Sequence, residues 1–164
     1  MAHRILITGA ARYLGGDFIA RLPDAKLPPY EKLYAFIRTD EEAEFVQQCG
    51  AEPLRLATYD AEGLRNAVVE NGITIVFWLI EVVKEEGPVI IINALAEVKA
   101  STGKAVHFIH TTTVKTFSNL AGAPINGTMS DTSGNLYKIQ KKIQKEQAAS
   151  FECRQNEQYG HRAI

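Results

Sequence analysis

The sequence predicts an α/β fold in which a doubly wound parallel sheet carries helices on both faces. Short apolar segments alternate five times with segments of helical character, as expected for a parallel sheet. The strongest segment, residues 73–80 (ITIVFWLI), is apolar and β-branched at nearly every position, as in a strand covered on both sides. The first apolar segment leads directly into a glycine-containing turn and then a helix, which is an arrangement that suits phosphate binding.

Five strands are expected, each from a short apolar run bounded by turn residues. The first, Ile5 to Ile7, is broken by Thr8 and Gly9, and Pro53 weakens the third. The expected strands cover residues 5–7, 33–37, 52–57, 73–80 and 105–109.

Five helices are expected after these strands, from apolar spacing or from signals at their ends. In the first, Leu14, Phe18 and Leu22 lie at i, i+4 and i+8. Thr39 and Glu42 have the spacing of a capping box at the start of the second helix. Asp60 caps the third, and Pro88 opens the fourth. The expected helices cover residues 13–22, 40–49, 61–70, 88–99 and 136–149.

Length and composition predict one globular domain over residues 1–164, because 164 residues can bury a sizeable core. Residues 151–164 form a polar C-terminal segment without a clear element, similar to the approach to a sixth strand. A net charge of −1 gives no electrostatic reason to expect nucleic acid. No apolar run reaches the ~20 residues of a membrane span, so no membrane partner is expected.

Cysteine usage and the N-terminus favour a cytoplasmic location. Cys49 and Cys153 lie far apart in the sequence and form no pair with metal-ligand spacing, so no metal site is expected. The chain enters its first strand at once, which leaves no room for a signal peptide. A reducing cytosol fits these features best.

The turn after the first strand is the best candidate for a binding site. Thr8 and Gly9 end the strand, Ala10 and Ala11 keep the turn small, and Gly15 falls near the start of the helix. Such a turn directs backbone N–H groups and the positive end of a helix dipole at one point. A phosphate is the ligand that this point suits.

Residues 4–16, RILITGAARYLGG, resemble the nucleotide fingerprint TGxxGxxG of the extended and atypical short-chain dehydrogenase/reductases. Thr8, Gly9 and Gly15 match, whereas Arg12 stands where the family has its middle glycine. The fingerprint and the right-handed crossover rule favour a Rossmann-like sheet of order 3-2-1-4-5, with a flavodoxin-like order as the alternative. The resemblance implies a dinucleotide bound at Thr8, Gly9, Ala11, Arg12, Tyr13, Leu14 and Gly15.

The side chain at the end of the second strand distinguishes the two nicotinamide cofactors in Rossmann proteins. Arg38 stands there, and a guanidinium suits the 2′-phosphate of NADP better than the ribose hydroxyls of NAD. The resemblance therefore implies NADP over NAD. Asp60 matches the family's acidic residue at the adenine and is equally well explained as a helix cap.

A second motif, Tyr137 and Lys141, has the YxxxK form of the family's active site. Residues at i and i+4 share one face of a helix, and a nearby cation favours the phenolate. The resemblance implies that Tyr137 exchanges a proton with the substrate oxygen and that Lys141 also holds the nicotinamide ribose. Thr113 is the best match for the family's catalytic hydroxyl.

These features together predict an NADP(H)-binding oxidoreductase-type domain that acts on a small-molecule substrate by hydride transfer, epimerisation or dehydration. The resemblance extends from residue 4 to about residue 149, and the chain is expected to stop before the family's C-terminal substrate domain. Two alternatives stay open: a non-catalytic nucleotide sensor similar to the NmrA-like regulators, and an inactive truncated Rossmann domain. Uncovered helix faces and a sheet edge predict a homo-oligomer.

Overall fold

The computed structural model of the chain describes residues 2–56, 60–80, 85–111, 130, 132 and 134–145. The chain divides into two units, Met1–Thr112 and Thr113–Ile164, and each is described by itself.

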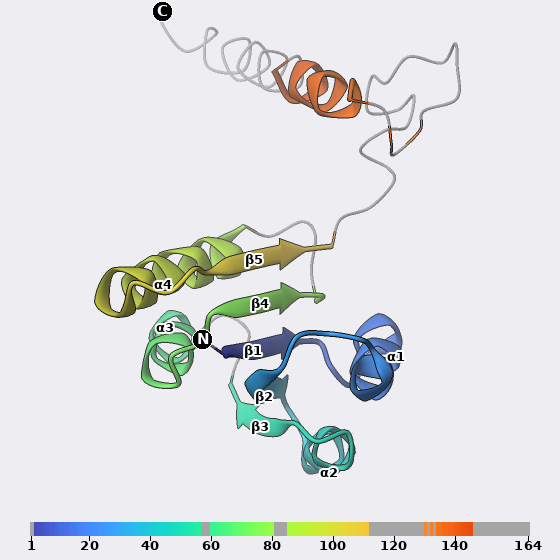
Figure 1. Cartoon of the computed structure of the whole chain (residues 1–164), viewed down its shortest axis with the longest axis vertical. Helices are drawn as coiled ribbons and strands as arrows, with labels where there is room; N and C mark the ends of the chain where they lie inside the picture. The colour runs from blue at the N-terminus through green and yellow to red at the C-terminus, as the bar shows by residue number, and fades with distance from the viewer. Residues whose placement is uncertain are drawn as a thin grey trace, which may run out of the picture. The chain divides into compact units, whose positions relative to one another are not determined.

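The described part of the first unit contains a sheet of five parallel strands in the order β3-β2-β1-β4-β5 (Figure 1). The strands are β1 His3–Thr8, β2 Tyr30–Ile37, β3 Glu52–Arg55, β4 Ile75–Trp78 and β5 His107–His110. The chain moves outward from β1 to β3, then returns to pair β4 with the other side of β1. This order confirms the Rossmann-like prediction over the flavodoxin-like alternative.

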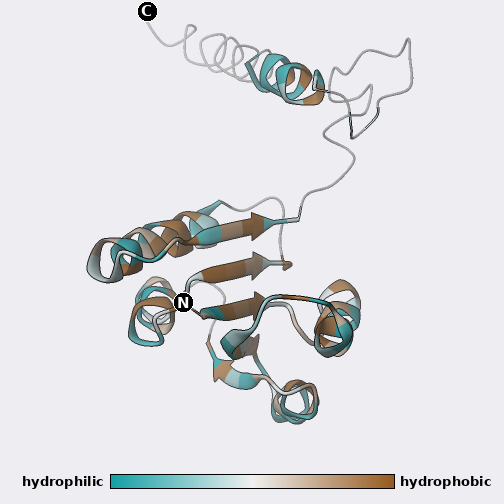
Figure 2. Cartoon of the chain, in the orientation of Figure 1, coloured by the Kyte–Doolittle hydropathy of each residue, from teal (hydrophilic) through white to brown (hydrophobic). Residues whose placement is uncertain are grey.

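Helices cover both faces of the sheet (Figure 1). The helices are α1 Tyr13–Arg21, α2 Asp40–Gln48, α3 Ala61–Glu70 and α4 Glu86–Thr102, with a 3₁₀ turn, η1, at Leu22–Asp24. Ile5 and Ile7 of β1 pack with residues of α1 and α2, whereas Leu6 packs with residues of α3 and α4. Alternate residues of a strand point to opposite faces, so β1 contributes to both cores. Figure 2 shows the apolar character of the central strands.

The observed strands are shorter than their apolar runs at β3 and β4. The run 73–80 contains only four residues of β4, although Ile73 is fully buried. The N–H of Ile73 donates to the carbonyl of Val68 at 3.0 Å, which closes the connection from α3. An apolar run indicates a buried segment, and here the buried segment is longer than the part that pairs with neighbouring strands. Pro53 lies in β3, an edge strand where its missing N–H is tolerated.

Helix α4 has one buried apolar side and a second, exposed one. Ile91 and Leu95 are buried against the sheet, whereas Val89 and Ile92 are about half exposed. Pro88 lies in the first turn of the helix, as predicted. The predicted self-association is not tested by these features and stays a prediction.

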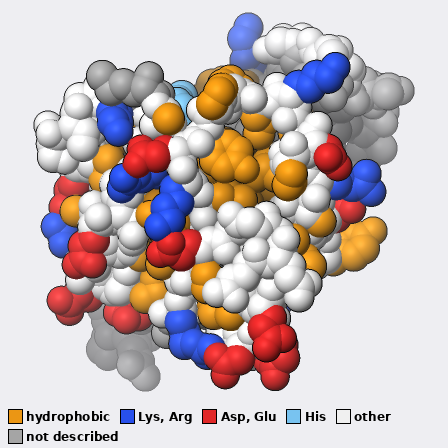
Figure 3. All heavy atoms as spheres, turned by 60° about the horizontal axis from the view of Figure 1, so that its bottom comes forward, with side chains coloured by type: hydrophobic (Ala, Val, Ile, Leu, Met, Phe, Trp, Pro, Cys, Tyr) orange, Lys and Arg blue, Asp and Glu red, His pale blue; other side chains and the backbone are white. Residues whose placement is uncertain are grey.

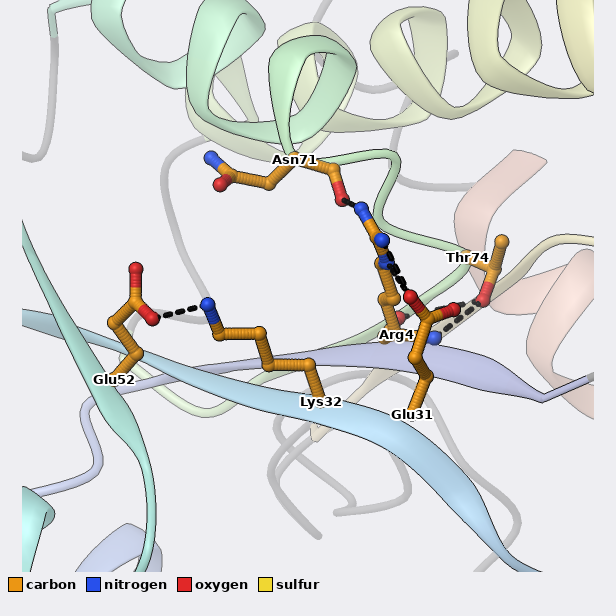
Figure 4. A network of polar contacts seen from close by, with 6 residues as sticks. All are labelled: Arg4, Glu31, Lys32, Glu52, Asn71 and Thr74. Carbon is orange, nitrogen blue, oxygen red and sulfur yellow. Dashed lines mark hydrogen bonds and ion pairs between the residues drawn. The ribbon is translucent and has the colours of Figure 1, made fainter.

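Ion pairs and hydrogen bonds connect the amino ends of the strands (Figure 4). Arg4 on β1 pairs with Glu31 on β2 and donates to the carbonyl of Asn71 at 2.9 Å. Lys32 on β2 pairs with Glu52 on β3. The hydrogen bond from Arg4 holds the pKa of the Glu31 carboxyl below its ordinary value. These contacts stabilise the amino-terminal edge of the sheet. Ligands in this fold bind at the opposite edge, at the carboxyl ends of the strands.

The described part of the second unit contains a helix over residues 136–145, within the predicted range 136–149. Ile143 is buried, and the N–H of Ile139 donates to the carbonyl of Asn135 at 3.0 Å. Thr113 and the predicted C-terminal segment 151–164 lie outside the described residues. Within the described residues, none of the helices combines the length and apolar character of a transmembrane segment.

Candidate functional site

Two positions at the turn between β1 and α1 require glycine, Gly9 for its backbone angle and Gly15 for lack of space. Gly9 has φ +69°, in the left-handed region. A Cβ atom on Gly9 would also lie 2.7 Å from Cγ2 of Ile80, in the segment after β4. At Gly15, a Cβ would lie 2.1 Å from the carbonyl oxygen of Gly9. The two glycines therefore let α1 pack directly against the end of β1.

The N-terminus of α1 faces this turn without a side-chain cap. Arg12 is the N-cap residue in extended conformation, and no side chain in the described part of the chain caps the helix there. The first turn of α1 also contains no acidic residue, whereas α2, α3 and α4 each have one or more. The first N–H groups of a helix need partners from outside it. At α1 they keep the capacity to bind an anion.

The side chains of the turn point largely to solvent. Arg12 and Ala11 are exposed, and Tyr13 is 99% exposed. Leu14 is half exposed and lines a shallow hollow of about 210 Å³ on α1, together with Phe18 and other residues. Contacts from these positions to a ligand would therefore come mainly from the backbone.

The Thr8 hydroxyl is buried at the end of β1, and its predicted contact with the cofactor stays a prediction. Its side chain is fully buried, accepts the N–H of Leu79 at 2.9 Å and reaches the carbonyl of Phe77 at 3.3 Å. This hydroxyl connects the end of β1 to the end of β4, the two neighbouring parallel strands at which the strand order reverses. Thr8 thus positions the turn, a role that the fingerprint alone does not specify.

Arg38 follows β2 and is surrounded by charged residues. Its backbone N–H donates to Oε2 of Glu42 at 2.6 Å, and its Nη2 lies 3.5 Å from Oε1 of the same carboxylate. Its carbonyl accepts Nη1 of Arg55 at 2.7 Å, and Arg55 also pairs with Asp40. The Arg38 side chain is 54% exposed, so its guanidinium remains accessible at the carboxyl end of the sheet.

The predicted capping box of α2 is half confirmed. The Thr39 hydroxyl accepts the N–H of Glu42 at 3.2 Å, as the pattern predicts. The Glu42 carboxylate, however, accepts the N–H of Arg38 rather than that of Thr39. The pKa of the Glu41 carboxyl lies below its ordinary value. The main cause is its hydrogen bond with the Thr39 side chain, and the second is its hydrogen bond with its own backbone N–H.

Asp60 is the N-cap of α3, as predicted. Its Oδ1 accepts the N–H of Gly63 at 3.0 Å, and the side chain remains exposed. This confirms the helix-cap interpretation and leaves a contact with adenine as a prediction.

Of the predicted catalytic residues, the structure describes Tyr137 and Lys141, and Thr113 lies outside the described residues. The Nζ atom of Lys141 lies 5.1 Å from the centroid of the Tyr137 ring, within reach of a cation–π contact. Both side chains are exposed, Tyr137 by 65%. The i, i+4 spacing therefore places phenol and ammonium side by side on one helix face. In the described ranges, no group of three or more His, Cys, Asp or Glu side chains could hold a metal ion.

The strand order and the glycine turn together identify the described part of the first unit as a Rossmann-like domain. No protein-family model matches the sequence, and the search of curated proteins finds no match either. Among solved structures, the chain is similar to a short-chain type dehydrogenase/reductase from Mycobacterium marinum, with a TM-score of 0.53 and 18% identity over 77% of this chain. It is also similar to an isoflavone reductase, with a TM-score of 0.52 and 18% identity over 92% of this chain. The chain spans 59% and 47% of the length of these two proteins, and it shares their fold.

Sequence reasoning missed the contacts of Arg55 and Glu42 with Arg38. Arg55 is the last residue of β3, and its Cα pairs with that of Ile37 in the sheet. Because the carboxyl ends of parallel strands meet at one edge and β3 ends at Arg55, Arg55 lies beside Arg38. The expected third strand extends to residue 57, so the strand order alone did not identify this contact.

Proposed function

We propose that this chain binds a nicotinamide dinucleotide, with NADP(H) preferred over NAD(H), and that it is a domain of oxidoreductase type. The observation that carries the proposal is the uncapped, acid-free N-terminus of α1 above the Gly9 turn, beside the point where the strand order reverses. Open α/β sheets bind their ligands at this point. The names of the two similar structures, a dehydrogenase/reductase and an isoflavone reductase, support hydride transfer as the reaction class.

In this proposal, each part of the dinucleotide has its own partner. The N–H groups at the start of α1 bind the pyrophosphate, and Gly9 and Gly15 allow the close packing of α1 on the turn that positions these groups. Arg38 binds the 2′-phosphate, and Asp60 lies near the adenine. Tyr137 exchanges a proton with the oxygen of a small-molecule substrate, Lys141 holds the nicotinamide ribose, and Thr113 orients the substrate.

The cofactor preference is tested by Arg38→Ala. The substitution removes a charge-assisted contact to the 2′-phosphate, so we expect the Kd for NADPH to rise roughly tenfold while that for NADH stays nearly unchanged. Isothermal titration with both cofactors measures the two constants. The control is Arg65→Ala. It also removes a half-exposed arginine from an ion pair, but that pair, with Glu97, lies between α3 and α4. Equal losses for both cofactors would remove Arg38 from this role.

Arg12 is tested separately, because a glycine in its place allows the closest approach of the pyrophosphate. We expect Arg12→Gly to tighten NADPH binding, since any Cβ at this position intrudes on the phosphates. The same titration checks this. Weaker binding would instead identify the exposed Arg12 guanidinium as a phosphate ligand and would contradict the steric argument.

A further inference from the structure

The backbone of Arg38 is held on both sides by charged side chains. Glu42 of α2 accepts its N–H at 2.6 Å, and Arg55 of β3 donates to its carbonyl at 2.7 Å. Both polar groups of this residue's backbone are therefore occupied by side chains from two different elements. The direction in which the Arg38 side chain leaves the backbone is fixed by these two contacts.

The Arg38 guanidinium, in contrast, is only loosely held. Its ion pair with Glu42 is a single contact of 3.5 Å, and the side chain is 54% exposed. A fixed backbone with an accessible guanidinium lowers the entropy that is lost when a phosphate binds. Arg55 thus contributes to the site through Arg38 and does not need to touch the ligand itself.

Arg55 also changes the electrostatics of this edge. Its Nη2 pairs with the carboxylate of Asp40, which lies two residues after Arg38 and is 91% exposed. Without Arg55, this carboxylate would be unpaired and close in sequence to Arg38, and charges interact over ~8 Å at physiological salt. It would then repel a 2′-phosphate and leave a ribose hydroxyl largely unaffected.

We propose that Arg55 is a positioning residue for the recognition of a 2′-phosphorylated dinucleotide, acting through the carbonyl of Arg38 and the carboxylate of Asp40. The proposal rests on the proposed function. It adds that selectivity between the two cofactors depends on β3 as well as on the residue that follows β2.

The test is a double-mutant cycle on the full chain, with Kd values for NADPH and NADH measured for wild type, Arg55→Met, Arg38→Ala and the double variant. We expect Arg55→Met to raise the Kd for NADPH about three- to tenfold and that for NADH less than about twofold. In the Arg38→Ala background, we expect Arg55→Met to have a smaller effect on the Kd for NADPH, because only the repulsion from Asp40 remains, and still little effect on that for NADH. A purely structural role would weaken both cofactors equally and would persist undiminished in that background, which would overturn the proposal.

Two further variants make the outcome unambiguous. Arg65→Met removes an arginine of similar exposure from an ion pair with Glu97, and should leave both Kd values unchanged. Arg55→Lys keeps the charge, but lysine lacks the guanidinium fork that contacts the Arg38 carbonyl and the Asp40 carboxylate at once. We therefore expect it to recover only part of the affinity. Full recovery by lysine, or no effect of Arg55→Met, would overturn the positioning role while leaving the proposed function intact. A wild-type chain that binds neither cofactor would contradict the proposed function, and the role of Arg55 would fall with it.

Discussion

Gly15→Ala is expected to lower the free energy of unfolding by about 3 kcal/mol and to abolish dinucleotide binding. The new Cβ would lie 2.1 Å from the carbonyl oxygen of Gly9 and 3.1 Å from Cα of Ala10, both backbone atoms. The turn or the helix must therefore move. Alanine gains at most about 1 kcal/mol over glycine in a helix, which does not offset this overlap. Urea unfolding of the purified chain measures the change.

Gly16→Ala is the matched control, because it lies next to Gly15 in the same helix. Its Cβ would lie 3.5 Å from the carbonyl oxygen of Ala10 and 3.9 Å from the ring of Phe45, which are ordinary contacts. We expect this variant to be as stable as the wild type or more stable by up to about 1 kcal/mol. Equal destabilisation by the two substitutions would show that close packing of α1 on the turn is not what requires Gly15.

Tyr137→Phe is expected to reduce turnover by about 10²- to 10⁴-fold with NADPH and a simple carbonyl substrate, and to leave the Kd for NADPH nearly unchanged. In the proposed function the phenol donates a proton to the substrate, and the phenyl ring of the variant has no proton to donate. Lys141→Met should reduce both turnover and NADPH binding, because the ammonium lies beside the Tyr137 ring and is expected to contact the ribose as well. Absorbance at the nicotinamide band follows turnover.

The control for Tyr137→Phe is Tyr30→Phe, at the amino end of β2 and thus at the edge of the sheet opposite the proposed site. Lys145→Met, on the same helix as Lys141, controls for the loss of a lysine from that helix. Activity that survives Tyr137→Phe would mean that YxxxK is only a surface pattern of a basic helix. A nucleotide-sensing role would then account better for a bound cofactor.

The strand order could be predicted from the family resemblance and the crossover rule, and most helix ends from local signals. Gly9 and Gly15 identified the turn, and Thr39 and Asp60 identified the starts of α2 and α3. Long-range contacts could not be predicted in this way. The buried hydroxyl of Thr8 binds the N–H of Leu79, 71 residues away, and Arg55 binds the carbonyl of Arg38, 17 residues away. Neither contact has a sequence pattern of its own, because each depends on which strands become neighbours.

The ends of the strands were also poorly predicted, for a related reason. Ile73 is apolar and fully buried, yet its N–H closes a turn and lies outside the β4 ladder. An apolar run shows that a segment is covered and does not show which of its N–H groups pair with a neighbouring strand. The prediction of the dinucleotide site suffered less from these errors, because that site depends on Gly9, Gly15 and the start of α1.

Titration of the purified chain with NADPH and NADH tests the central claim most directly. We expect saturable binding of both cofactors, tighter for NADPH, and loss of both when Gly15 is replaced by alanine but not when Gly16 is. Such a result would connect binding to the close packing of α1 on the Gly9 turn. Failure of the folded wild-type chain to bind either cofactor at millimolar concentration would contradict the claim that this turn is a dinucleotide site.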